Sequence, residues 1–467
     1  MVNISSVKTI KEKPRETKVY READVVVVGG GPGGVGAALA AARNGADTIL
    51  VERYGHLGGM ATGGLVTAIP NMSDASGKQW IRGICWEWIE RLDKLDATFY
   101  PKKEELGSGD PKLVKWWADR SIFVTRLGKV ILSVNIDPEV GKSVLVNMME
   151  EAGVKQVLHS WGTETVMEGN EARGIIFESK SGRQAILAKA VIDSTGDGDL
   201  LPSAGAAFED DISTTLRIKK LSLEFMMGNV DVFRADTFRF SQPQKHAELM
   251  TELEKMGGNP SGGRMFMRSG LKDQDNFVEF DQRYNVSSQT DVDELTRIEI
   301  LGRKNILNTY SFYKRYVPGF EHCYLALSAP QLGTRGARRV DGELRLTAKD
   351  MDSPEIYEDT ISVFPDVDRR EASMKHPLMY MPYRCIVPKT VDNLLVGCRA
   401  FSSDDQTNNV FNLIPHCLAL GEVAGTAAAI AIKNGTNVRR VDIRQLQRQL
   451  TQQGVLLPDK IEAGVKV

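Results

Sequence analysis

The feature that most constrains this chain is the run GGGPGG at residues 29–34, which directly follows an apolar, β-branched segment. Residues 24–28 read DVVVV, a pattern typical of a buried parallel strand. From residue 33 to residue 44 small and apolar residues recur at helical spacing, and Gly45 stands where a glycine commonly ends a helix. A second apolar run at 48–52 completes a predicted strand–helix–strand unit of about 30 residues.

The glycines satisfy the spacing G-x-G-x-x-G, with Gly29, Gly31 and Gly34 in the fixed places. In such a motif the first glycine permits a tight turn, the second lets the backbone approach a pyrophosphate, and the third lets helix and strand pack closely. The helix N-terminus then presents free N–H groups to the phosphates. Glu52 lies 23 residues after Gly29, close to the spacing at which an acidic side chain binds the ribose. The pattern predicts a Rossmann-type dinucleotide site.

Two further segments favour FAD over NAD, which the glycine motif alone does not separate. A second glycine-rich loop, GGMATGG at 58–64, would let backbone amides pass close to a long cofactor, although a hinge without a ligand fits it too. Residues 415–433 are predicted as a helix that begins at Pro415 and is ended by Gly435. Its N-terminus could stabilise negative charge on the N1–C2=O edge of a reduced flavin; plain core packing is the alternative.

Composition and charge narrow the range of binding partners expected for this chain. A formal net charge of −2, from 59 basic and 61 acidic residues, argues against nucleic acid as the main partner. The five cysteines include no C-x-x-C pair, so no metal site is predicted and reduced thiols in the cytoplasm are the simplest interpretation. Residues 413–432 are long and apolar but rich in Ala and Gly and interrupted by His416 and Glu422, which favours a buried helix over a membrane span.

Five stretches, at 24–64, 190–206, 331–350, 381–404 and 412–431, together resemble one family in their order and motifs. The chain resembles the FAD-dependent oxidoreductases of the glutathione-reductase-like superfamily, in particular the group with an LGGMAT loop and a DATGDGD segment. The resemblance implies a flavoprotein of α/β class, in which a Rossmann-type FAD-binding domain with a parallel sheet and a β-meander carries an inserted α+β substrate domain.

The resemblance also implies which residues contact the cofactor. The positions that match the family's motifs, or lie beside those that do, are Gly29, Gly31, Pro32, Gly33, Gly34, Glu52, Arg53, Gly58, Gly59, Met60, Ala61, Thr62, Gly196, Asp197, Asp199, Ser403 and Asp404. Two features depart from the family: Ser194 stands where it usually has Ala, and the loop at 401–412 is unusually rich in Asp and Asn.

Local patterns divide the chain into four parts. We expect a flexible leader at 1–22, a first part of the FAD-binding domain at 23–208, an inserted substrate or cap domain at 209–380, and the C-terminal part of the FAD-binding domain at 381–467. Within these parts the patterns predict a strand at 130–134, a helix at 137–151, an antiparallel meander at 156–159, 163–167, 174–179 and 184–187, strands at 191–193 and 393–397, and a helix near 292–316.

The acid–base residue is predicted to come from the C-terminal part. His416, at the start of the helix at 415–433, could donate to a reduced flavin or move a proton; a buried core histidine fits equally. Tyr383 and Arg384 could face the active-site cleft, with a surface turn as the alternative. His376 is a weaker candidate of the same kind.

Three arginines invite a second hypothesis. Arg335, Arg338 and Arg339 could clamp a substrate carboxylate. Pairing with acids such as Asp341 and Glu343 is the interpretation we favour.

These observations predict hydride transfer between flavin N5 and a small organic substrate, either C–H oxidation or reduction of an activated C=C bond. The alternatives are a flavin monooxygenase that uses NAD(P)H and an FAD-binding sensor or assembly protein without turnover. Since no second G-x-G-x-x-G follows a strand, a dedicated NAD(P)H domain is not expected. Electrons would then pass to or from the substrate, oxygen, a quinone or a redox protein. An oligomer is compatible with the sequence.

Overall fold

The computed structural model describes residues 10–121, 123–258, 267–268, 277–365 and 378–465. Its main sheet has seven strands, in the order β8-β2-β1-β11-β10-β9, with β20 also paired to β11. Their bounds are β1 Lys18–Val28, β2 Thr48–Val51, β8 Lys155–Val157, β9 Trp161–Glu168, β10 Glu171–Ser179, β11 Gly182–Asp193 and β20 Leu394–Val396. Strands β8, β2, β1, β11 and β20 pair in parallel, whereas β9, β10 and β11 form an antiparallel meander.

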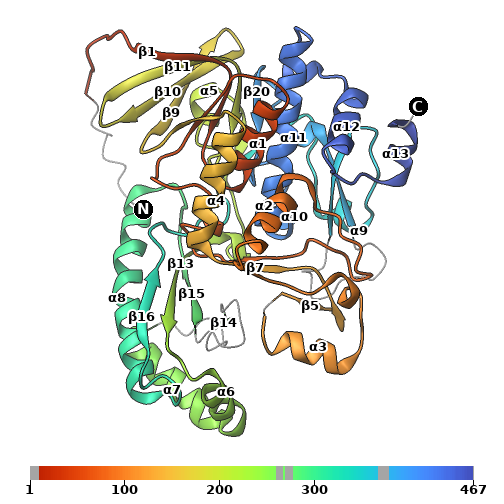
Figure 1. Ribbon diagram of the computed structural model, residues 1–467. Coiled ribbons are helices and arrows are strands. Elements are labelled where there is room, and N and C mark those ends of the chain that lie inside the picture. Colours follow the sequence, from red (N-terminus) through yellow and green to blue (C-terminus); the bar gives the residue numbers. More distant parts are fainter. Residues whose placement is uncertain (1–9, 122, 259–266, 269–276, 366–377, 466–467) are drawn as a thin grey trace.

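Two helices pack closely behind this sheet. They are α1, Pro32–Arg43, and α11, Ile414–Lys433, which lie side by side next to the parallel strands (Figure 1). A Cβ added at Gly421 would collide with the carbonyl oxygen of Gly33, and one at Gly425 with that of Ala37. Glycine is therefore required for the two backbones to approach this closely.

Helix α11 alone among the described helices is long and apolar enough to span a membrane, yet its most apolar 18-residue window is completely buried. This burial agrees with the expected core helix. Helix α2, Gly83–Asp93, packs against α11, and α4, Pro138–Glu151, packs against α2 and α1.

A second body, green to teal in Figure 1, lies below the main sheet. Its antiparallel sheet has the order β14-β15-β13-β16, with β13 at Lys220–Gly228, β14 at Met267–Arg268, β15 at Val278–Asn285 and β16 at Tyr324–Ser328. The helices are α6 Val232–Ser241, α7 Pro243–Lys255 and α8 Val292–Tyr316, of which α8 runs along the sheet. The rings of Phe225 and Phe280 stack at 4.7 Å between centroids in its core.

The remaining elements are short. The short strands form small sheets: β3 Ala68–Ile69, β4 Thr98–Phe99 and β7 Val134–Ile136; β5 Thr125–Arg126 and β6 Lys129–Val130; β12 Phe208–Glu209 and β17 Arg339–Val340; β18 Thr360–Pro365 and β19 Leu378–Pro382. The further helices are α3 Pro111–Ala118, α5 Leu201–Ala204, α9 Ala348–Asp352, α10 Asp405–Phe411, α12 Ile443–Gln452 and α13 Asp459–Val465.

The predicted α/β class and strand–helix–strand unit are confirmed, and the helix expected near 292–316 is α8. Several boundaries differ. Strand β1 begins at Lys18, so residues 18–22 belong to the sheet rather than to a leader. Strand β8 pairs in parallel with β2 and lies outside the meander. The strands expected at 184–187 and 191–193 are one strand, β11, and the strand expected at 130–134 is divided between β6 and β7.

The second body's sheet and helices span residues 220–328, a narrower range than the insertion expected at 209–380. After it the chain returns toward the first body, since β17 pairs with β12. The division into FAD-binding and substrate domains stays a proposal.

Candidate functional site

A cleft of about 710 Å³ opens at the carboxyl ends of β1, β2 and β11. Strand β2 pairs with one edge of β1, and β11 pairs with the opposite edge. The cleft therefore sits at a topological switch point, where the strand order reverses. Its lining residues are Val28, Gly29, Gly31, Pro32, Gly33, Val51, Glu52, Arg53, Tyr54, Gly59, Met60, Ser160, Trp161, Gly162, Ser194, Thr195, Gly196, Asp199, Gln331, Thr334, Cys398, Arg399 and Cys417.

The glycines of the first loop differ in what surrounds them. Gly29 has φ +98°, and a Cβ there would collide with the carbonyl oxygen of Ser194. A Cβ at Gly34 would collide with the carbonyl oxygen of Gly29. At Gly31, by contrast, the nearest atom to an added Cβ is the Cα of Gly59, at 3.9 Å. Gly31 therefore faces open space at the N-cap of α1, where no described side chain caps the helix. This is the space that a pyrophosphate needs.

Glu52 closes one end of the cleft. Its Oε2 accepts a hydrogen bond from the Gly30 N–H at 2.5 Å and its Oε1 accepts one from the Tyr54 N–H at 2.8 Å. Burial raises the pKa of this carboxyl, while the two amides act in the opposite direction. Each carboxylate oxygen keeps a free lone pair, so the side chain fixed by these amides can still accept both ribose hydroxyls.

Beside Glu52, Arg53 is stacked between two rings at the mouth of the cleft. Its guanidinium carbon lies 5.0 Å from the ring centroid of Tyr54 and 5.5 Å from that of Trp161. Trp161 is 55% exposed. These flat groups offer a surface on which an adenine base can stack.

Only part of the second glycine loop lines the cleft. Gly59 and Met60 do, within the 3₁₀ turn Gly59–Ala61. The Gly58 N–H donates to the Gly30 carbonyl at 2.8 Å, which joins the two loops. Ala61 and Thr62 are completely buried, and the Thr62 hydroxyl donates to the Leu57 carbonyl. Gly58, Ala61 and Thr62 therefore support the loop, and their contact with the cofactor stays a prediction.

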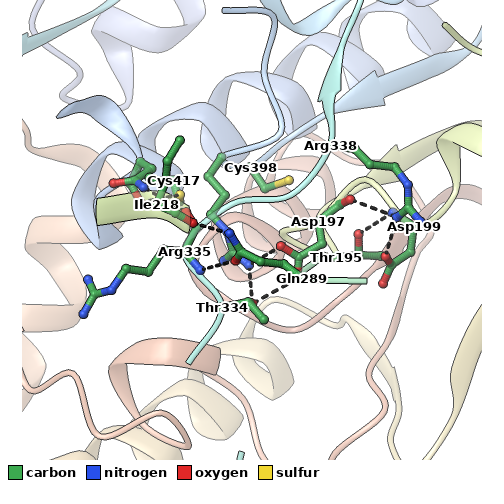
Figure 2. A network of polar contacts seen from close by, with 12 residues as sticks. Thr195, Asp197, Asp199, Ile218, Gln289, Thr334, Arg335, Arg338, Cys398 and Cys417 are labelled. Atoms are coloured by element: carbon green, nitrogen blue, oxygen red, sulfur yellow. Dashed lines mark hydrogen bonds and ion pairs between the residues drawn. The ribbon is translucent and has the colours of Figure 1, made fainter. Parts of the chain in front are cut away.

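The turn after β11 contributes Gly196 and Asp199 to the cleft. Burial, with the nearby charges of Asp197 and Asp193, raises the pKa of Asp199 to about 6. Asp197 does not line the cleft. Its carboxylate pairs with Arg399 at 2.8 Å. It also accepts from the Thr334 hydroxyl at 3.0 Å (Figure 2).

An inner cavity of about 770 Å³ adjoins the cleft. The two share Pro32, Met60, Thr334, Arg399 and Cys417 as walls. The other lining residues are Val66, Ala68, Pro70, Phe123, Arg217, Ser222, Gly333, Arg335, Asn412, Leu413 and Ile414. Leu413 is the N-cap of α11, and within the described chain no side chain caps this end of the helix. Leu413 and Ile414, at this end, line the inner cavity.

His416 turns away from both spaces. It is completely buried, and its ring stacks on Phe364 at 4.3 Å between centroids. Burial lowers its pKa to about 3, so the ring is neutral, and neither ring nitrogen has a hydrogen-bond partner among the described residues. The expected catalytic histidine is thus a core side chain in this structure, and the adjacent Cys417 reaches the cleft instead.

Tyr383 and Arg384 also lie elsewhere, because the turn after β19 directs them toward other parts of the chain. The buried Tyr383 hydroxyl donates to the Val438 carbonyl at 2.7 Å. Arg384 forms two hydrogen bonds with Asp359, at 2.9 and 3.0 Å. Neither residue lines the cleft or the inner cavity, so a catalytic role for them lacks structural support. His376 lies outside the described residues.

Ser403 and Asp404 hold the loop before α10 rather than the cleft. Asp404 is the N-cap of α10: its Oδ1 accepts from the Thr407 N–H and its Oδ2 from the Ala348 N–H, both at 2.8 Å. Ser403 is buried, and its carbonyl accepts from Arg339 at 3.1 Å. Neither residue lines the cleft or the inner cavity, and their contact with the flavin stays a prediction.

The arginines of residues 335–339 pair with acids, but with different acids from those expected. Arg338 lies 3.2 Å from Asp199 and Arg339 lies 3.6 Å from Glu209. Arg335 lies 3.4 Å from Asp281. Asp341 and Glu343 instead pair with Lys389 and Arg439.

Sequence reasoning missed Arg399, Thr334 and Cys417 as site residues. Arg399 lies three residues after the end of β20, and this position in the loop after a parallel strand was the available signal. Burial raises the pKa of Cys417 to about 11, so it is a thiol at neutral pH. All five cysteines are free and buried, and the described residues contain no cluster of metal-ligating side chains.

The family model of FAD-dependent oxidoreductases matches residues 24–450, and the chain belongs to this family. It is an FAD-dependent oxidoreductase with a Rossmann-type nucleotide-binding fold, and FAD is its cofactor. No curated protein sequence matches it significantly.

Solved structures with a similar fold are distant. One is a geranylgeranyl bacteriochlorophyll reductase-like protein from Thermoplasma acidophilum, with 14% identity, a TM-score of 0.42 and 96% of this chain and 91% of that chain covered. Another is the p-nitrophenol 4-monooxygenase PnpA from Pseudomonas putida, with 11% identity, a TM-score of 0.45 and 95% and 92% covered. A third is the myxobacterial chondrochloren halogenase CndH, with 11% identity, a TM-score of 0.45 and 96% and 82% covered. These similarities are too low to transfer chemistry to this chain.

Proposed function

We propose that the enzyme transfers a hydride between flavin N5 and a small organic substrate that occupies the inner cavity. The observation that carries this proposal is the shared wall of the cleft and the inner cavity, formed by Pro32, Met60, Thr334, Arg399 and Cys417. A long cofactor bound in the cleft would end where the cavity begins. The substrate would then occupy the cavity beyond that point.

The residues present fit FAD along the whole cleft. Glu52 would accept the ribose hydroxyls, and the amides at Gly31 and Gly33 with the N-terminus of α1 would hold the pyrophosphate. The uncapped N-terminus of α11 at Leu413 and Ile414 would face the redox end. When bound, the flavin supplies hydride or electron transfer at N5. Whether the chain belongs to the glutathione-reductase-like subgroup stays a prediction.

The chain's own residues orient the substrate and exclude water. Met60, Val66, Ala68 and Phe123 give the inner cavity an apolar wall. The partial positive charge at the start of α11 favours negative charge that develops nearby. The Cys417 sulfur stays protonated at neutral pH and therefore acts as neither a nucleophile nor a metal ligand there.

Anaerobic spectroscopy of the purified protein tests this proposal. Alcohols, amines and sugars are mixed with the oxidised protein, and enoates with the photoreduced protein, while the flavin spectrum is recorded. If hydride is transferred, one class of these compounds bleaches the absorbance of the oxidised flavin, or restores it in the photoreduced protein, without NAD(P)H. Reduction by NAD(P)H alone, followed by incorporation of an oxygen atom into product, would instead identify a monooxygenase. Oxygen, a quinone or a redox protein added afterwards then identifies the external electron partner.

A further inference from the structure

Three arginines, Arg217, Arg335 and Arg399, line the inner cavity. Within the part of the chain that the structure describes, no Asp or Glu lines it. Arg399 is committed to the first body, because its guanidinium bonds to Asp197 at 2.8 Å and to Thr334 at 2.7 Å. Arg217 and Arg335 come from the other side, where the second body meets the cavity.

The hydrogen-bond donors of the Arg335 guanidinium are not all paired within the described residues. Its closest acid, Asp281, lies 3.4 Å away, beyond the usual N–H···O distance of about 2.7–3.2 Å, and also pairs with Arg283. The Nε of Arg335 is buried without a hydrogen-bond partner among the described residues. In Figure 2 the Arg335 guanidinium extends away from the network around Asp197. A guanidinium with an unpartnered Nε–H and one long bond to Asp281, at the wall of the inner cavity, is suited to a planar anion.

The two arginine-bearing segments are fixed relative to each other. The Arg217 guanidinium donates to the Asn409 carbonyl at 2.5 Å and to Asn412 Oδ1 at 3.3 Å. The side-chain amide of Asn412 donates to the Arg335 carbonyl at 2.8 Å. Gln289 adds a second connection, since it accepts from the Arg335 N–H at 3.3 Å and donates to the Ile218 carbonyl. Both guanidinium groups are thus positioned before any ligand arrives, which lowers the entropic cost of binding.

The acids behind Arg335 do not cancel this positive charge completely. Glu224 and Glu279 are buried side by side, and burial raises the pKa of both carboxyls, that of Glu224 well above its ordinary value. Burial therefore favours the uncharged form of Glu224. Asp281 is the one carboxylate that pairs with Arg335 among the described residues, and Arg283 shares it.

From this arrangement we infer that the substrate is a small apolar or aromatic carboxylate. Its carboxylate would bind Arg335 and Arg217, while its apolar body would lie against Met60, Val66 and Phe123. The inference rests on the proposed function, because it assigns the substrate class of that same site.

Paired probes that differ only in charge test this inference. Benzoate and benzamide, and hexanoate and hexanamide, are titrated into FAD-loaded protein by calorimetry and, in parallel, by flavin difference absorbance. The carboxylates should bind at least about 10-fold more tightly than their amides, because hydrogen bonds to a charged group are worth more than neutral ones. Arg335→Gln should weaken carboxylate binding about 10- to 100-fold and change amide binding little. Arg335→Lys should lie between Arg335→Gln and the wild type.

Arg297→Gln, on the exposed face of α8, is the matched control and should bind both probes as the wild type does. Equal affinity for carboxylate and amide, no binding of any probe, or wild-type carboxylate binding by Arg335→Gln would each overturn the inference. If Arg335→Gln loses FAD, the inference is tested by carboxylate binding against amide binding in the wild type and by carboxylate binding to Arg335→Lys. Failure of the proposed function looks different: carboxylates bind with the expected arginine dependence, yet no carboxylate reduces or reoxidises the flavin.

Discussion

Gly31 and Glu52 have different roles at the glycine-rich turn between β1 and α1. Gly31 leaves open the space in front of the α1 N-terminus, and Glu52 is oriented beside that space by the Gly30 and Tyr54 amides. Because backbone amides hold it, the carboxylate reaches a ribose without rearrangement. Low reorganisation of this kind is what makes a buried carboxylate useful for binding.

Glu52→Gln should weaken FAD binding about 10- to 100-fold, since it replaces charge-assisted hydrogen bonds worth about 1.5–3 kcal/mol by neutral ones. The measurement is a titration of the apoprotein with FAD, followed by fluorescence. Glu22→Gln, at the exposed end of β1, controls for loss of a charge. Wild-type affinity in Glu52→Gln would remove this residue from the ribose.

His416→Phe should keep the flavin, its potential and its turnover within about threefold. The ring lies flat against Phe364 and its two nitrogens are buried without partners among the described residues, so an apolar ring of similar shape satisfies the position better. Potentiometry and the pH dependence of kcat check this. Loss of turnover in a variant that retains FAD would restore His416 as a catalytic residue.

Single residues differed in how well the sequence predicted them. Gly29, Gly31 and Glu52 lie within one strand–helix–strand unit, so local spacing was enough to place them in the cleft. Asp404 could not be placed in this way. Its partners include Ala348, far along the chain, and no local pattern says that a carboxylate will cap a helix rather than face a cofactor.

At the scale of elements, the packing of α1 against α11 governs the site. The small residues of α11 predicted a tightly packed helix, and the structure places it directly on α1. The continuity of β11 was not predictable in the same way. Its first half pairs with β10 and its second half with β20, so the burial pattern changes midway and resembles two strands.

Glu422 makes the stability of α11 depend on pH. Burial raises the pKa of its carboxyl to about 8, and its Oε2 accepts from the Ile84 N–H at 3.0 Å, at the start of α2. Between the ordinary glutamate pKa of 4.5 and about 8, the folded state binds more protons than the unfolded state. The contribution of Glu422 to stability is therefore present below that window and is lost as the pH rises through it.

Glu422→Gln removes this titration, so its free energy of unfolding relative to the wild type should rise steadily between about pH 5 and pH 8. Chemical denaturation of the two proteins across that range measures the difference. Glu254→Gln on α7, whose position in the described chain is exposed, should give a difference that does not vary with pH. A constant difference for Glu422→Gln would show that Glu422 is ionised in the folded protein.

At the scale of the whole molecule, the two bodies meet around the inner cavity. Thr67 lies in the segment after the second glycine loop, and its hydroxyl donates a hydrogen bond to Glu279 of β15 at 2.7 Å. Both groups are buried. This bond joins the cofactor side of the cavity to the sheet that carries its other wall.

Thr67→Val should lower the free energy of unfolding by about 1–3 kcal/mol, since it leaves a buried carboxylate without its donor. Thr67→Ser keeps the hydroxyl and should lose much less stability. Denaturation monitored by tryptophan fluorescence compares the two. Equal stability of Thr67→Val and the wild type would mean that water or another group takes the place of Thr67.

The chain-level organisation could be predicted only in outline. A return of the C-terminal part to the first sheet followed from the strand pattern at 393–397, and β20 pairs there. The limits of the second body did not follow, because pairs such as β12 with β17 are two residues long and leave no periodic signal. Contacts between segments so far apart depend on tertiary packing.

The most direct test of the account is a crystal structure of the protein with FAD bound. It should show the adenosine ribose hydroxyls within hydrogen-bond distance of Glu52, the pyrophosphate in front of Gly31, and the redox end of the flavin at the wall shared with the inner cavity. A dinucleotide bound elsewhere, or a cleft filled by side chains when FAD is present, would contradict the account.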